Sequence, residues 1–233
     1  MATAALACAR LGLRTRYVGA FGDDEWAPLV RAPLLAHGVD VLSLPVRPGT
    51  PSRTAIIVVS EDGDRRIYEH RSPGLLADAD AVSSDVIAET RVLLVDATHA
   101  ALARRAVEHA KQAGVLTICD VDRPGADTES LLAVIDVAVM PAELATHMTG
   151  ERDPVRAVAD LADACPDARL VVATCGADGS VCRCAGRIIT TPAFAVDVVD
   201  TTGAGDTFRA GLAAGLVHLG PAPTPDDVLG MAN

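Results

Sequence analysis

Lysine and aromatic residues are almost absent from this sequence. Its 233 residues include a single lysine, Lys111, and six aromatic side chains, and the formal net charge is −11. Nucleic-acid-binding proteins contact phosphates through basic patches, which an acidic chain with scattered arginines does not favour. No apolar segment reaches about 18 uncharged residues, so we expect no membrane span. The expected partners are small molecules or a second copy of the chain.

Several catalytic and metal-binding motifs are also missing. The chain has no G-x-x-x-x-G-K-[ST] segment, which excludes a P-loop enzyme, and it lacks the protein-kinase motifs. None of its six cysteines forms a C-x-x-C pair, and Cys182 and Cys184 have the closest spacing. Cysteines inside apolar runs are typical of buried side chains in a reducing cytosol, so we expect a cytoplasmic protein. Any phosphoryl transfer must use backbone amides, a metal ion and arginines.

Strand-like and helix-like segments alternate along most of the chain. The first residues, MATAALACARLGLRTR, have helical spacing and no basic region ahead of their apolar part, so they are interpreted as structure and not as a signal peptide. Short apolar strands separated by helices predict a parallel sheet that is covered on both faces, an α/β fold. The predicted helices are 2–11, 24–37, 101–113, 131–134, 142–148, 154–164 and FRAGLAAGLVHLG; the predicted strands are TRYVGAFG, RVLLVDA, VLTICDVD, VAVM and RLVVATCG, with a hairpin in SVCRCAGRIITTPAF.

Three strand-like runs interrupt this alternation between about residues 39 and 71. They are VDVLSLPV, TAIIVVS and RRIYEHR, and the EDGD segment at residues 61–64 predicts a hairpin turn between the last two. Antiparallel strands inside a βα chain indicate a small side layer that does not belong to the central sheet.

The stretch VVDTTGAGDTFRAG, residues 198–211, carries the most informative chemistry. Glycines let the backbone approach an anion closely, and a helix N-terminus offers free N–H groups and the positive end of the helix dipole. The TGAG turn therefore predicts a phosphate-binding site. Asp206 at its mouth suits a general base that takes a proton from a hydroxyl attacking the terminal phosphate. The alternative from these residues is that Asp206 caps the helix and the glycines make a plain turn.

DTTGAGDTFRAG resembles the C-terminal signature of the PfkB family, the ribokinase-like sugar and nucleoside kinases. Three more segments resemble the family in the same order: YVGAFGDDEWA, GDRRIYEHR and ATCGADGS. The resemblance covers essentially the whole chain. It implies a ribokinase-like three-layer αβα sandwich with a mostly parallel sheet and a small β lid at about residues 39–71. It also implies ATP-dependent phosphorylation of a sugar hydroxyl, with Mg²⁺ as cofactor.

Carried over residue by residue, the resemblance assigns the phosphoryl-transfer site to the start of the last helix. Asp206 corresponds to the catalytic base. Gly203, Ala204 and Gly205, with the amide of Asp206, correspond to the anion hole.

The resemblance also implies a nucleotide site and two metal sites. Thr174, Gly176 and Gly179 correspond to the residues that line the nucleotide, although the two glycines alone are also compatible with a plain turn. Asp200 and Thr202 fall where relatives hold a monovalent cation such as K⁺, with an ordinary strand-end cap as the alternative for Asp200.

The family motif N-x-x-E, which helps hold magnesium through water, is altered in this chain. In VMPAELATHMTG, Pro141 stands near the asparagine position and Glu143 is one residue out of register. Glu143 is the expected magnesium residue, with a solvated helix position as the alternative. In relatives, a glycine pair and a sugar-binding strand precede the position of Met1, and a further helix follows the position of Asn233. We therefore expect residues 1–233 to form a single kinase domain that is incomplete at both ends.

Substrate residues are indicated only by their position. Asp96, Thr98 and His99 follow the strand in LLVDATHA, at the sheet edge where α/β proteins usually bind ligands, although His99 also suits a surface position. Arg123 in CDVDRPG has a similar position and could meet a phosphate or a carboxylate; an exposed arginine without a ligand is the alternative.

Three functions remain open at this point. The scarcity of aromatic residues favours a sugar over a nucleobase that would need stacking, so a sugar kinase of the ribose, fructose or keto-sugar type is expected. An adenosine- or inosine-type nucleoside kinase and a non-catalytic sugar- or nucleotide-binding relative are the alternatives. Relatives often cover their exposed lid strands by dimerising, so a homodimer through the lid is expected.

Overall fold

The computed structural model describes residues 1–46, 48–60, 65–219, 229–230 and 232. Its main sheet has six strands in the order β10–β9–β8–β7–β6–β5. The strands β5 to β8 pair in parallel, and β9 and β10 add an antiparallel hairpin at one edge, as predicted. The bounds are β5 Val92–Asp96, β6 Leu116–Asp120, β7 Val137–Pro141, β8 Leu170–Thr174, β9 Ser180–Cys184 and β10 Arg187–Thr191.

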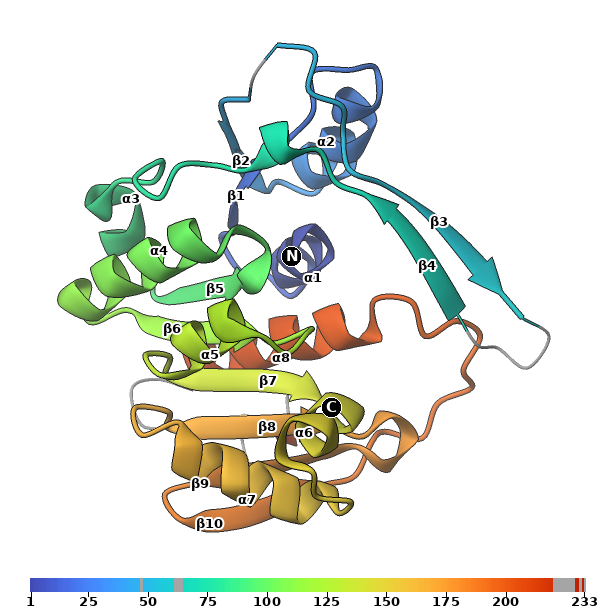
Figure 1. Ribbon diagram of the computed structural model, residues 1–233, viewed down its shortest axis with the longest axis vertical. Coiled ribbons are helices and arrows are strands. Elements are labelled where there is room, and N and C mark those ends of the chain that lie inside the picture. The colour runs from blue at the N-terminus through green and yellow to red at the C-terminus, as the bar shows by residue number, and fades with distance from the viewer. Residues whose placement is uncertain (47, 61–64, 220–228, 231, 233) are drawn as a thin grey trace.

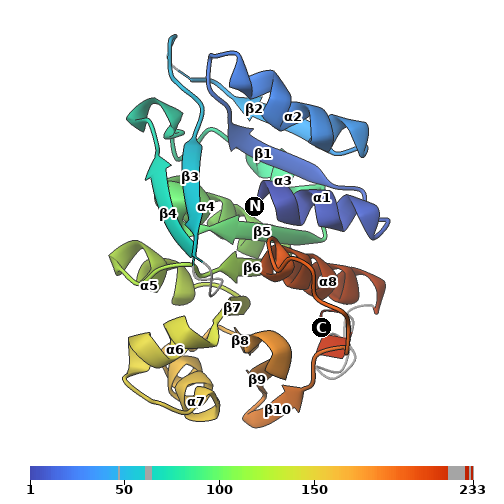
Figure 2. The same cartoon turned by 90° about the vertical axis from the view of Figure 1, so that its right-hand side faces the viewer.

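Helices cover both faces of this sheet (Figure 2). Along β7, Ala138 and Met140 pack into one apolar cluster with α4 to α7, while Val137 and Val139 pack into another with α1 and α8. Burial on both faces explains why the strand is apolar throughout and does not alternate. The prediction of an αβα sandwich is confirmed. The helices are α1 Ala2–Arg10, α4 Ala100–Ala113, α5 Ala126–Leu132, α6 Ala142–Thr149, α7 Pro154–Ala164 and α8 Ala204–His218.

Two small sheets lie outside the main one (Figure 1). β1 (Arg16–Ala20) and β2 (Asp40–Leu44) are joined through α2 (Trp26–Ala36) and pair in parallel, so the antiparallel arrangement predicted for VDVLSLPV is wrong. The reason is the helical connection: a βαβ unit returns the chain in the same direction. Only β3 (Thr54–Val59) and β4 (Arg65–His70) form the predicted antiparallel hairpin. Its predicted turn at residues 61–64 lies outside the described residues.

Two helices differ from the sequence prediction. The predicted helix 131–134 is instead α5, Ala126–Leu132. The sequence indicated only the last turn, because the buried apolar residues Leu131 and Leu132 lie there. Its polar first turn follows Gly125, and Asp127 and Glu129 lie at the favourable positive end of the helix dipole. The five-residue helix α3, Ser84–Ala88, was not predicted, because one buried residue, Ile87, shows no periodicity. Among the described helices, none is both long and apolar enough to cross a membrane.

Candidate functional site

The parallel register brings the predicted site residues to one edge of the main sheet. Asp96 ends β5 opposite Asp120 at the end of β6, and Thr174 ends β8 opposite the last residue of β7. Glu143 lies in the first turn of α6, directly after β7. Carboxyl ends of parallel strands form the usual ligand-binding edge of an α/β sheet. Residues that are up to 78 positions apart therefore share one edge.

The start of α8 presents backbone N–H groups at this edge. Gly203 is the N-cap residue with φ +80°, a left-handed conformation that favours glycine. The amide of Thr202 donates to Asp200 Oδ1 (2.8 Å), and that of Ala204 donates to the carbonyl of Thr201 (3.1 Å). Within the described part of the chain, the amides of Gly205 and Asp206 have no such acceptor. The α8 terminus thus offers two open donors for an anion.

Asp206 stands in this first turn with 26% of its side chain exposed. Its Oδ1 atom lies 3.8 Å from the amino group of Met1, the N-cap of the neighbouring helix α1. A carboxylate that is accessible and beside open amide donors can accept a proton from a hydroxyl group brought to the same place. The geometry therefore permits the role that the sequence assigned to Asp206.

Sequence reasoning missed a buried ion pair beneath this turn. Arg209 is 8% exposed on α8, and its Nη2 atom forms a close ion pair with Asp120 at the end of β6. The Arg209 guanidinium also passes Gly205, where an added Cβ would lie 2.9 Å from Nη1. Gly205 thus leaves the space that Arg209 occupies. The only sequence signals were a charge in an apolar helix, FRAGLAAGL, and an acid ending an apolar strand.

Asp120 and Asp206 lie within electrostatic range of each other. Burial raises the pKa of Asp120 to about 6; Arg209 and the N-terminal amino group lower it, while Asp122 and Asp206 raise it further. The cation of Arg209 therefore offsets the mutual repulsion of carboxylates at this edge of the sheet. The ion pair also ties the first turns of α8 to the end of β6.

The predicted nucleotide residues form a turn between β8 and β9. Gly176 and Gly179 both have positive φ, +58° and +88°. An added Cβ on Gly179 would lie 2.0 Å from the carbonyl oxygen of Thr191, so close packing against β10 also requires glycine there. Thr174 Oγ1 lies 3.5 Å from the carbonyl oxygen of Met140, which joins this turn to β7.

Glu143 faces the same turn from α6. Burial raises the pKa of Cys175, and the carboxylates of Asp178 and Glu143 raise it further, so both acids lie near this cysteine. Among the described residues, no group of three or more His, Cys, Asp or Glu side chains could hold a metal ion. Magnesium commonly binds through one or two carboxylates together with substrate phosphates, and Glu143 fits that pattern.

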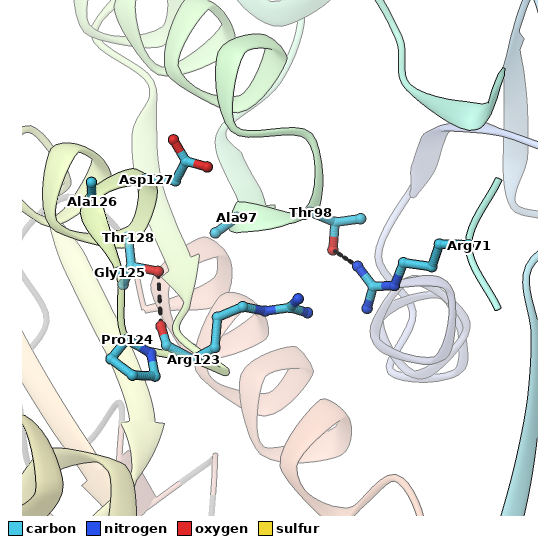
Figure 3. A pocket seen from close by; sticks show the side chains of 9 residues that line it. All are labelled: Arg71, Ala97, Thr98, Arg123, Pro124, Gly125, Ala126, Asp127 and Thr128. Carbon is cyan, nitrogen blue, oxygen red and sulfur yellow. Dashed lines mark hydrogen bonds between the residues drawn. The ribbon is translucent and has the colours of Figure 1, made fainter. Parts of the chain in front are cut away.

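The predicted substrate residues gather at the other end of this edge. Asp96 accepts from the amide of Thr98 (2.8 Å), and Thr98 Oγ1 accepts from Arg71 Nη1 (3.4 Å). Figure 3 shows Arg71 and Arg123 on opposite sides of a pocket below Thr98. His99 follows Thr98 in the chain; its Nδ1 accepts from the amide of Ala77 (3.4 Å), and burial lowers its pKa. Arg71, which follows β4, was not predicted as a site residue.

Residues 2–225 match the pfkB family carbohydrate kinases. The chain belongs to this family. Fructokinase-1 of Zea mays is 30% identical over 91% of this chain and 71% of its own length. A ribokinase of Arabidopsis thaliana, solved with ribose and ATP, matches 98% of this chain and 76% of its own with a TM-score of 0.79 and 25% identity. Adenosine kinase of Sinorhizobium meliloti shares the fold, with a TM-score of 0.79 and 24% identity over 92% of this chain and 69% of its own.

Family membership identifies the chain as an ATP-dependent sugar kinase, a phosphotransferase with an alcohol group as acceptor. The curated relatives include fructokinases of Zea mays and Solanum tuberosum, which does not favour the nucleoside alternative. The adenosine kinase shares the fold but does not identify the acceptor.

The ion pair beneath the pfkB signature predicts a non-additive effect on stability. Asp120→Leu or Arg209→Met alone should lower the free energy of unfolding by about 3–5 kcal/mol, because each leaves an unpaired buried charge. The double variant should be more stable than either single variant. Urea unfolding of the four proteins measures this coupling, and costs that simply add would contradict it.

The Asp120–Arg209 ion pair also predicts how the stability of the fold depends on pH. The pKa of Asp120 is raised from 3.8 to about 6, so the folded chain binds the extra proton and this group favours folding most at low pH. Without Arg209 the carboxylate is still harder to ionise. The stability deficit of Arg209→Met relative to wild type should therefore grow as pH rises through and above about 6, where the wild-type carboxyl ionises, as measured by urea unfolding at several pH values. A deficit that stays constant over this range would show that the charge of Arg209 is not what matters.

The nucleotide turn predicts a difference between two glycines. Gly179→Ala combines a positive φ with a clash, whereas Gly186→Ala at the β9–β10 turn has a positive φ in open space. Left-handed backbone costs about 1–2 kcal/mol for a non-glycine residue. Gly179→Ala should therefore lower the free energy of unfolding by clearly more than this, and Gly186→Ala should not. Thermal unfolding checks the stabilities, and the KM for ATP should rise only in Gly179→Ala. Equal losses would contradict this account.

Proposed function

We propose that this pfkB kinase transfers the γ-phosphoryl group of ATP to a hydroxyl of a small carbohydrate of the fructose, ribose or keto-sugar type. The observation that carries the proposal is the start of α8. There the accessible carboxylate of Asp206 and the open amides of Gly205 and Asp206 share one helical turn. A proton acceptor and an anion site are thereby combined at one point. The fructokinase relatives and the Arabidopsis thaliana ribokinase support this class of acceptor.

In the proposed reaction, the sugar hydroxyl gives its proton to Asp206 as its oxygen attacks the γ-phosphorus. The bond from that phosphorus to the bridging oxygen of ADP breaks, so the products are a sugar phosphate, ADP and a proton. The amides of Gly205 and Asp206, which follow the left-handed Gly203 and the first helical residue Ala204, stabilise the charge on the transferred group. Arg209 holds this turn against β6 through Asp120 and acts only by positioning it.

We propose that Thr174, Gly176 and Gly179 line the nucleotide, because their turn adjoins the same sheet edge. Glu143 is the proposed residue for Mg²⁺, which when bound neutralises charge on the nucleotide phosphates. Asp200 and Thr202 are proposed to hold a monovalent cation such as K⁺. Their position supports this, because the loop they form leads directly into α8.

We propose further that the β3–β4 hairpin is a lid through which two copies of the chain associate. Paired residues of an antiparallel ladder share a face, so Ile57 and Ile67 lie on one face and Ile56 and Tyr68 on the other. All four are more than half exposed. Exposed apolar strands are normally covered by a partner. A cytoplasmic location is proposed because all six cysteines are free.

Replacing the proposed base tests the function. Asp206→Asn keeps the size of the side chain but cannot accept a proton, so kcat for sugar phosphorylation should fall about 10²- to 10⁴-fold. The measurement is ADP release with Mg-ATP over a panel of sugars and adenosine, with Asp160→Asn on the exposed side of α7 as the matched control. Full activity in Asp206→Asn would refute the assignment. Turnover of adenosine alone would favour a nucleoside kinase, and ATP binding without turnover of any acceptor would favour a non-catalytic relative.

The lid proposal predicts the oligomeric state. Light scattering after size exclusion should give a dimer for wild type. Ile57→Glu, which puts a charge on the exposed hairpin, should give a monomer. Leu29→Glu on α2 is the control, since Leu29 is 62% exposed but lies outside the hairpin. A monomeric wild type, or a dimer unaffected by Ile57→Glu, would rule out association through the lid.

A further inference from the structure

The chain has a pocket of about 340 Å³ that the proposed transfer of phosphate from ATP does not use. It lies where the hairpin meets the sheet edge, because Arg71 directly follows β4 while Thr98 and Arg123 follow β5 and β6. Figure 3 shows these side chains around one open space. The lining residues are Arg71, Ala97, Thr98, Arg123, Pro124, Gly125, Ala126, Asp127 and Thr128.

Two guanidinium groups converge in this pocket. In Figure 3, Arg71 and Arg123 extend toward one another from opposite walls, and the Asp127 carboxylate points away from both. Electrostatic effects agree with this placement. Arg123 lowers the pKa of Asp122 and Arg71 lowers it further, while Asp122 raises the pKa of Arg123 and Glu69 raises it further. In a chain with one lysine, the side-chain cations come almost entirely from arginines.

A carboxylate holds each arginine through hydrogen bonds. Arg71 Nε donates to Glu69 Oε2 (2.6 Å), and Arg123 donates through Nε and Nη2 to Asp122 (3.1 and 2.8 Å). The loop that carries Arg123 is itself fixed, because Thr128 Oγ1 donates to the Arg123 carbonyl (2.8 Å). A guanidinium has five N–H donors, so donors of both arginines remain for a ligand. The two guanidinium groups are thus oriented before a ligand binds.

The chemistry of this pocket fits an anion better than a neutral hydroxyl. Planar guanidinium groups match the paired oxygens of a carboxylate or a phosphate and bind them through charge-assisted hydrogen bonds. The pocket also lies at the strand end that contacts α8. Arg123 follows Asp120 by three residues, and Asp120 pairs with Arg209, which lies about one helical turn after Asp206 on α8. The geometry therefore favours an acceptor with its anionic end between the arginines and a hydroxyl directed toward Asp206.

We propose that the acceptor is an acidic sugar, and that Arg71 and Arg123 bind its carboxylate or phosphate group. This inference rests on the proposed sugar-kinase function and specifies its substrate class. Because Arg71 follows the hairpin and Arg123 follows β6, the bound anion also links the lid to the sheet.

The wild-type chain should prefer acidic acceptors. We would measure kcat/KM with Mg-ATP for fructose, for 2-keto-3-deoxygluconate as a carboxylate probe, and for tagatose 6-phosphate as a phosphate probe. One of the two acidic sugars should exceed fructose by at least tenfold, and the better one identifies the anion. A preference for fructose over both acidic sugars would overturn the inference while leaving the sugar-kinase function intact.

Removing either cation should reduce that preference. In Arg123→Gln and Arg71→Gln, the ratio of kcat/KM for the acidic sugar to that for fructose should fall at least tenfold, while Arg156→Gln on the exposed side of α7 should keep the wild-type ratio. Equal losses for both sugars would show a structural role only and overturn the inference.

Calorimetry without ATP measures binding of the acidic sugar independently of catalysis. Wild type should bind the preferred acidic sugar, and Arg123→Gln should bind it at least tenfold more weakly. If no acceptor is phosphorylated, the proposed function fails, yet binding that depends on Arg123 would still support the anion site. Absence of binding by wild type would overturn it.

Discussion

The parallel pairing of β5 to β8 is the constraint on which the rest of the site depends. Because these strands run in one direction, their last residues reach the same edge, and Asp96, Asp120 and Thr174 share it although they are far apart in the chain. Burial on both faces makes the strands apolar and rigid, so polar chemistry is confined to the positions where they end. The sheet therefore acts as a fixed frame for residues supplied by loops and helix starts.

The ion pair of Asp120 and Arg209 connects this frame to the proposed phosphoryl-transfer turn at the start of α8. A buried pair of this kind is a weak source of stability compared with apolar packing, since both charges lose their hydration. Its main effect here is on geometry, because it holds the start of α8 close to the end of β6. Arg209 lies across the space that the absent side chain of Gly205 leaves, so α8 can begin close to β6 with its open amides at the sheet edge. Gly205 thus serves the packing of an arginine as well as the proposed approach of an anion.

Arginines take the place of lysine throughout the site. The only lysine, Lys111, forms an ion pair with Asp167, away from this edge of the sheet. Arg209 is buried beneath the transfer turn, while Arg71 and Arg123 are partly exposed in the pocket beside the lid. A guanidinium keeps its charge when it is buried and can contact a carboxylate on one side and a ligand on the other. One residue type thereby supports both the packing of α8 and the proposed recognition of an acidic sugar.

Local sequence patterns were enough to predict the α/β fold and the turn that carries the proposed base, Asp206. The apolar strands have a short-range pattern, and the segment from Asp200 to Gly211 keeps its turn residues and its acid adjacent in the chain. Local patterns were insufficient for α5, whose first turn is polar, and for β2, whose direction depends on the helix before it.

Which charges from distant parts of the chain come into contact depends on the tertiary fold. Asp120 and Arg209 are 89 positions apart, and Arg71 and Arg123 are 52 positions apart. The sequence around each of these side chains does not show which other charge it contacts. Whether it becomes buried, paired or directed into a pocket depends on strand register and on the packing of separate elements. No short-range periodicity carries that information, because charge pairing acts through space and not along the chain.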